Sequence, residues 1–171
     1  MIRTADVSPC GRYRYALGRR WGDGPGLVFV MLNPSTADAE RDDPTIRKCM
    51  SYARRWGYFR VIVVNLFAFR ATDPKDLRAA IAIGDDVVGP LNDAAIRGVV
   101  ACADRVICAW GAKPWAVDRA AAVTDIIRNR KPHVSIEALA YAKNGAPVHP
   151  LYQRLELAPV IYPMPALEAD R

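Results

Sequence analysis

Short runs of apolar residues constrain this chain more than any other feature. Residues 27–32 (LVFVML), 60–66 (RVIVVNL) and 105–110 (RVICAW) each have the length of a strand, and residues 133–139 (HVSIEAL) supply a fourth. Continuous apolar runs of this length are typical of strands that are covered on both faces of a sheet. We therefore predict buried strands at these four places.

Helical patterns separate the runs. Residues 44–56 place Ile46, Cys49, Met50 and Ala53 at helical spacing, and residues 91–103 and 114–129 also read as helices. Strands that alternate with helices predict a parallel sheet with helices on both faces. The predicted fold is a three-layer α/β/α sandwich with a central, mainly four-stranded parallel sheet.

An antiparallel strand is expected before this unit. Residues 12–21 (RYRYALGRRW) alternate Tyr13, Tyr15 and Leu17 with more polar or smaller residues. This alternation is typical of a half-buried antiparallel strand. A chain of 171 residues accommodates one domain of this kind. We predict a single domain over residues 1–171, with a core at about 12–155 and a C-terminal tail at 156–171.

The positive charge is concentrated in the first part of the chain. Residues 1–70 hold 12 basic and 6 acidic residues, whereas residues 71–171 hold 12 of each, so the net charge of +6 arises in the first segment. Such asymmetry favours a polyanionic partner, namely DNA or a nucleotide. A solvated surface with surplus arginine explains the same numbers.

Cysteine and histidine usage argues against a metal centre. The chain has four cysteines without a CxxC pair and only two histidines, so we expect no metal and no cofactor. Cys102 and Cys108 lie in apolar surroundings typical of reduced thiols. No run approaches 18 apolar residues and the N-terminus has no hydrophobic signal core. We expect a cytoplasmic monomer with no membrane association.

Polar residues follow the predicted strands. In open parallel sheets, ligands bind beyond the carboxyl ends of the strands. Asn33 and Ser35 follow the first strand, Arg70 the second and Lys113 the third, while His149 lies in a Pro-bracketed segment after the fourth. Asparagine can orient a water, hydroxyls add donors, and histidine can donate to a developing oxyanion. Ordinary turn and loop roles are the competing interpretation.

One amide and several aromatic residues belong to the strand segments themselves. Asn65 lies within VIVVNLFAF, where a buried amide needs a hydrogen-bond partner, which a ligand or the backbone can supply. Phe67, Phe69 and Trp110 can stack on a base, although aromatic residues on buried strands are usually part of the core.

The motifs, taken in order, resemble an uncharacterised bacterial and phage family, domain of unknown function family 1643. The resemblance covers about residues 12–155, and the segments that carry it are LNPSTADAERDDPTIRKCMSYARRWGY, VIVVNLFAFRATDP, ICAWGAKP and GAPVHPLY. Asp38, Asp43, Arg70, Thr72 and Asn92 with Asp93 match its pattern. The family name implies no activity.

The same order of motifs is similar to that of the uracil-DNA glycosylase superfamily. That resemblance implies the three-layer fold and a flipped base as the substrate. It implies that Asn33 takes the water-activating position, that Asn65 reads the base edge, and that His149 stabilises the departing base anion. Phe67 or Trp110 would stack on the base, and Arg70 and Lys113 are the candidate contacts to phosphate.

Two departures from the glycosylase pattern stand out. An Asn at position 33 cannot act as a general base, and Ser35 replaces the aromatic residue that screens thymine in uracil enzymes. Asp38 or Asp43 could supply the missing carboxylate if the loop after the first strand folds over the pocket. Capping of the following helix is the alternative role for Asp43.

We expect an N-glycosylase that hydrolyses the base–sugar bond of a modified or mismatched base in DNA. An enzyme acting on free nucleosides or nucleotides in DNA modification and a non-catalytic module that binds a nucleobase or nucleic acid are the two alternatives.

Overall fold

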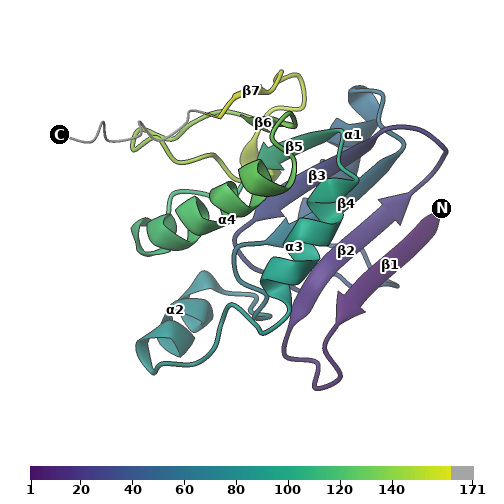
Figure 1. The fold of residues 1–171 in the computed structure, drawn as a ribbon. Helices are drawn as coiled ribbons and strands as arrows, with labels where there is room; N and C mark the ends of the chain where they lie inside the picture. Colours follow the sequence, from purple (N-terminus) through teal and green to yellow (C-terminus); the bar gives the residue numbers. More distant parts are fainter. Residues whose placement is uncertain (163–171) are drawn as a thin grey trace.

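The computed structural model describes residues 1–162 and centres on one seven-stranded sheet of order β1-β2-β4-β3-β5-β6-β7 (Figure 1). The strands are β1 (Ile2–Val7), β2 (Arg14–Arg20), β3 (Gly26–Met31), β4 (Arg60–Asn65), β5 (Arg105–Cys108), β6 (Ser135–Ala138) and β7 (Val160–Ile161).

The four central strands are parallel, as the apolar runs predict. β3 pairs with β4 from Gly26 opposite Arg60 to Met31 opposite Asn65, and its other edge pairs with β5. β5 in turn pairs with β6. All six residues of β3 are buried, because this strand has a neighbour on each side and helices above and below.

Antiparallel strands flank this parallel core. β2 pairs with β4 and confirms the predicted N-terminal antiparallel strand. Two further strands, β1 and β7, extend the sheet at its two edges and were not predicted from the sequence. Both edge strands are largely exposed, so they carry no apolar run to reveal them. Residues 163–171 of the predicted tail lie outside the described part of the chain.

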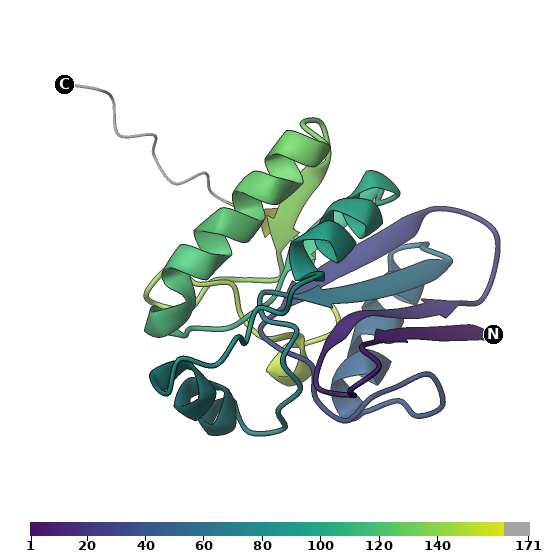
Figure 2. The same cartoon turned by 60° about the horizontal axis from the view of Figure 1, so that its bottom comes forward.

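Helices cover both faces of the sheet. The buried side of α1 (Pro44–Arg55) packs with Phe29, Val63 and Ile107 on one face. On the other face, α3 (Asn92–Ala101) and α4 (Val117–Arg130) pack with Val30 and Val106. Figures 1 and 2 show α3 beside α4, with α1 across the sheet from them. None of the helices in residues 1–162 is long and apolar enough to cross a membrane.

A further helix, α2 (Pro74–Ala82), was not predicted from the sequence. Only Leu77 and Ala80 of this helix are buried, so its apolar periodicity is weak. Asp73 caps it by accepting a hydrogen bond from the N–H of Lys75 at 2.8 Å, and Pro74 occupies its first turn. These two residues are the signal from which the helix could have been predicted.

The order of the strands places a crevice between β3 and β5. The chain leaves β3 toward α1 on one face and leaves β5 toward α4 on the other. Loops that diverge to opposite faces in this way open a space at the carboxyl ends of the two strands.

Candidate functional site

A cavity of about 660 Å³ lies at this divergence. Its volume falls within the range typical of small-molecule sites. The loop after β3 contributes Asn33 and Ser35, the loop after β5 contributes Trp110 and Lys113, and the segment after β6 contributes His149. Of the predicted strand-end residues, Asn33, Ser35, Lys113 and His149 are therefore brought together, whereas Arg70 is not part of this lining. Further lining residues are Thr45, Thr72, Leu151, Tyr152 and Gln153.

Asn33 has a fixed amide orientation. Its Nδ2 donates to the carbonyl oxygen of Ala71 at 2.7 Å and to that of Pro34 at 3.0 Å. Both donations engage the amino group of the amide, while Oδ1 makes no hydrogen bond to any described residue. The amide thus offers the cavity an acceptor that can hold a water.

His149 has a defined tautomer. Its Nδ1 accepts a hydrogen bond from the N–H of Leu151 at 3.3 Å, at the start of the short 3-10 helix η2 (Pro150–Tyr152). Burial lowers the pKa of His149, and the charge of Asp43 opposes this effect. The neutral ring therefore carries its proton on Nε2, which is available as a donor to a group in the cavity.

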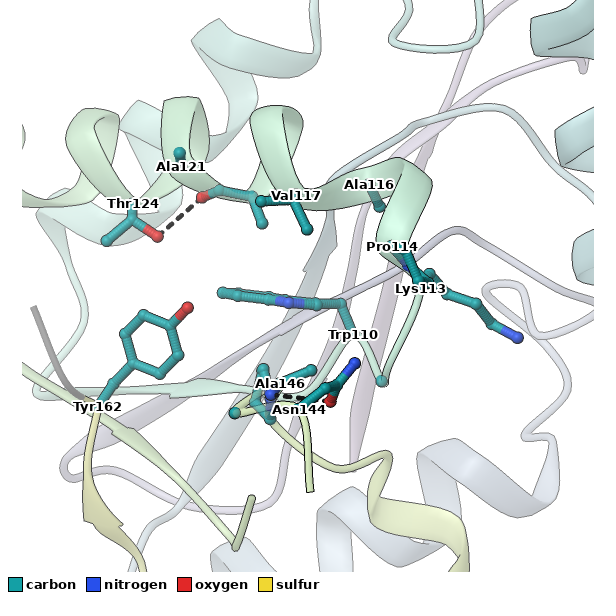
Figure 3. A pocket seen from close by; sticks show the side chains of 14 residues that line it. Trp110, Lys113, Pro114, Ala116, Val117, Ala121, Thr124, Asn144, Ala146 and Tyr162 are labelled. Atoms are coloured by element: carbon teal, nitrogen blue, oxygen red, sulfur yellow. Dashed lines mark hydrogen bonds between the residues drawn. The ribbon is translucent and has the colours of Figure 1, made fainter. Parts of the chain in front are cut away.

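Trp110 separates this cavity from a second one of about 310 Å³. Figure 3 shows the indole lying between α4 and the segment that includes Asn144 and Ala146. Tyr162 meets the indole edge-on, with ring centres 5.6 Å apart. Trp110, Gly111 and Lys113 line both cavities.

Hydroxyl groups and one exposed aromatic ring complete the larger cavity. Ser35, Thr45 and Thr72 contribute hydroxyls. Tyr152 is 83% exposed, and its ring centre lies 6.1 Å from that of His149. Tyr152 was not predicted as a site residue, because a tyrosine next to the apolar Leu151 gives no sign in the sequence of whether it is buried or exposed.

Arg70 lies beside the cavity. It lines an adjoining hollow of about 290 Å³ that shares Ser35 and Thr72 with the larger site. Its Nη1 donates to the carbonyl oxygen of Gly11 at 3.1 Å, which ties the side chain to the loop before β2.

The two candidate carboxylates are absent from the cavity lining. Asp38 accepts hydrogen bonds from the N–H groups of Arg41 and Glu40, each at 2.8 Å, and these bonds lower its pKa. Asp43 caps α1 by accepting from the N–H of Ile46 at 2.8 Å. Among the described residues, the cavity lining contains neither Asp nor Glu.

Asn65 and Phe67 are also outside the lining. Asn65 ends β4 and is 1% exposed, and its Nδ2 has no hydrogen-bond partner among the described residues. Phe67 is part of the core, with its ring centre 6.0 Å from that of Trp115. Neither residue therefore contacts the cavity that Asn33 and His149 line.

The adjacent residues Asn92 and Asp93 support the segment that follows β4. Asn92 donates to the carbonyl oxygens of Asn65 and Leu66 at 3.1 and 3.0 Å. Asp93 pairs with Arg119 at 2.5 Å, and that arginine donates to the Leu66 carbonyl at 2.7 Å. These contacts satisfy carbonyl groups at a strand end, which is a structural role.

Two buried arginines hold the loop between β3 and α1. Arg14 donates to the carbonyl oxygen of Ala37, and burial lowers the pKa of Arg14 to about 10. Arg19 is 1% exposed and donates to Asp42 at 2.7 Å and to the carbonyl oxygen of Asp38 at 2.5 Å. Arg14 and Arg19 of β2 therefore hold the loop that carries Asn33 through these hydrogen bonds.

The chain matches a known protein family. The family described as a protein of unknown function (DUF1643) matches residues 14–151, a range that includes Asn33 and His149. Neither the curated proteins nor the solved structures contain a match to the chain.

Proposed function

We propose an activity from the site itself, because the chain belongs to the DUF1643 family, whose description assigns none. The protein is an N-glycosylase that hydrolyses the base–sugar bond of a modified or mismatched base in DNA. The observation that carries this proposal is that Asn33 and His149 line one cavity with complementary free groups, an acceptor on Asn33 and a donor on His149.

These two groups match the charges that develop during the reaction. As the C1′–N bond breaks, its electron pair moves to the base and positive charge develops on the sugar. His149 Nε2–H donates to a carbonyl oxygen of the departing base and stabilises its negative charge. Asn33 Oδ1 accepts a hydrogen bond from the water whose oxygen forms the new bond to C1′.

The proton balance follows from the lining. An amide cannot take the water's proton, and the described lining contains no carboxylate to do so. The proton passes to solvent, and the released base takes up a proton in turn. This arrangement predicts a slow reaction that suits bases that are good leaving groups.

The cavity also supports recognition of an extruded base. Its volume of about 660 Å³ is ample for a nucleobase with a substituent, and Ser35 contributes a small side chain where an aromatic one would narrow the space. Tyr152, which is 83% exposed, provides aromatic surface for stacking, and Trp110 lines the same cavity. Lys113 provides a cation for a neighbouring phosphate.

The test is incubation of purified protein with duplexes that each contain one modified or mismatched base, followed by alkali. Abasic sites break under alkali, so strand breaks report base removal. Asn33→Ala and His149→Ala are expected to abolish the breaks. His133→Ala replaces the other, exposed histidine and is the matched control that keeps activity.

Absence of breaks in every duplex would refute the proposal. Turnover of free nucleosides without cleavage of DNA would instead support an enzyme of small molecules. Tight binding to DNA without product would support a non-catalytic module.

A further inference from the structure

We propose that the outer face of α1 binds the phosphates of the DNA strand that delivers its base to the cavity. This inference rests on the proposed N-glycosylase function and adds the surface that holds the substrate. The face, called here the α1 basic face, consists of Arg47, Lys48, Arg54 and Arg55.

The α1 basic face is the solvent side of an amphipathic helix. The opposite side is buried in the sheet through Ile46, Cys49, Met50, Tyr52 and Ala53. The helix contains four cations and no acidic residue. Arg55 lies eight positions after Arg47, so at a rise of about 1.5 Å per residue the face is about 12 Å long. That length corresponds to three or four phosphates at about 3.4 Å of helix axis per nucleotide of one strand.

Carboxylates do not neutralise these cations. Among residues 1–162, none of the four has an acidic oxygen within 4.0 Å. Asp42, which precedes the helix, pairs with Arg19 at 2.7 Å and with Arg3 at 3.4 Å. Glu156, whose charge acts on Tyr52 of α1, pairs with Arg154 at 3.9 Å. The nearby acidic groups thus have other partners.

Aromatic rings position two of the cations. The guanidinium of Arg54 lies over the ring of Trp21, 4.8 Å from its centre, and the amine of Lys48 lies 5.7 Å from the ring centre of Tyr52. A cation over the face of an aromatic ring is attracted by the negative charge of that face. Side chains that are already positioned lose less conformational entropy when they bind.

The α1 basic face begins at the mouth of the cavity. Thr45 lines the cavity, and Lys48 lies about one helical turn farther along α1. A strand whose base occupies the cavity therefore continues along this face. The same geometry explains why the excess charge lies in residues 1–70, since α1 holds four of the twelve basic residues there.

The experiment compares two triple variants of the full chain. The first replaces Arg47, Arg54 and Arg55 by glutamine, and the control replaces Arg78, Arg97 and Arg130, which are exposed on α2, α3 and α4. Each variant lowers the formal net charge from +6 to +3. Binding to a fluorescein-labelled DNA duplex with one mismatched base pair is measured by anisotropy at several KCl concentrations, on ice and before any base release is detectable.

The α1 variant is expected to bind about tenfold or more weakly at about 0.1 M KCl. Its slope of log Kobs against log[KCl] should be shallower by about 2 to 3, since each lost phosphate contact changes the slope by about 0.9. The control variant should keep a slope close to that of the wild type. Equal losses in the two variants, or no loss in the α1 variant, would overturn the proposal.

Failure of this proposal is distinguishable from failure of the proposed function. If the wild type releases base but its DNA affinity does not depend on α1, the DNA-binding role of the α1 basic face is refuted and the N-glycosylase proposal stands. If DNA binding depends on α1 but no base is released, the N-glycosylase proposal is refuted and the DNA-binding role of the α1 basic face stands. Circular dichroism of both variants establishes that each is folded.

Discussion

Asn33 and His149 are held in complementary hydrogen-bonding states by the backbone around them. Two carbonyl oxygens fix the amide of Asn33, and the N–H of Leu151 fixes the imidazole of His149. Their positions after β3 and after β6 predicted that they would meet, because parallel strands end at the same edge of a sheet. Their tautomer and orientation depend on backbone contacts that no sequence pattern reveals.

The pKa of His149 gives stability a pH dependence. Burial lowers its pKa in the folded protein below the ordinary value of 6.5, so the unfolded chain binds a proton more readily as pH falls. We expect wild-type protein to lose unfolding free energy between pH 7.5 and pH 5.5, and His149→Gln to lose less. Urea denaturation at the two pH values measures the difference. A loss in His149→Gln as large as in wild type and in the exposed control His133→Gln would contradict this expectation.

Tyr152 is predicted to stack on the substrate. An aromatic ring that stacks on a base contributes about 1–3 kcal/mol, so Tyr152→Ala should weaken DNA binding about 5- to 150-fold. Tyr152→Phe keeps the ring and should bind within about twofold of wild type. Anisotropy titration measures both affinities. Equal binding by all three proteins would exclude Tyr152 from recognition.

At the scale of elements, the sequence predicts what apolar runs control. The four parallel strands and α1 follow from continuous or periodic burial. β1 and α2 bury few residues, so their formation depends on pairing with β2 and on packing against the β4 exit. Asn65 was predicted to reach the site and does not. The packing around a strand residue decides whether its side chain reaches a cavity, and the sequence does not show that packing.

Arg19 is expected to be a main support of the segment before α1. Its side chain is fully buried and joins β2 to Asp42 and to the carbonyl oxygen of Asp38. Arg19→Met leaves Asp42 without this partner, and removal of one member of a buried pair costs about 3–5 kcal/mol. Arg20→Met, which removes an exposed pair with Asp23, should cost at most about 1 kcal/mol. Urea denaturation that shows equal stability for the two variants would contradict the role of Arg19.

At the scale of the whole molecule, the strand order, the cavity and the charge share one location. β3 lies between β4 and β5, and its loop supplies Asn33 to the cavity and then leads into α1. The sheet positions the cavity, and the α1 basic face lies beside it. The sequence shows that the excess charge is positive and lies in residues 1–70. Only the fold shows that four of these cations lie on one exposed face of α1.

Release of free base tests the central claim most directly. Mass spectrometry under single-turnover conditions should detect base released by wild type and by His133→Ala, in amounts equal to the abasic sites formed. The double variant Asn33→Ala/His149→Ala should release none above the level without protein. Release by that double variant at the wild-type rate, or no release by wild type from any duplex, would contradict the account.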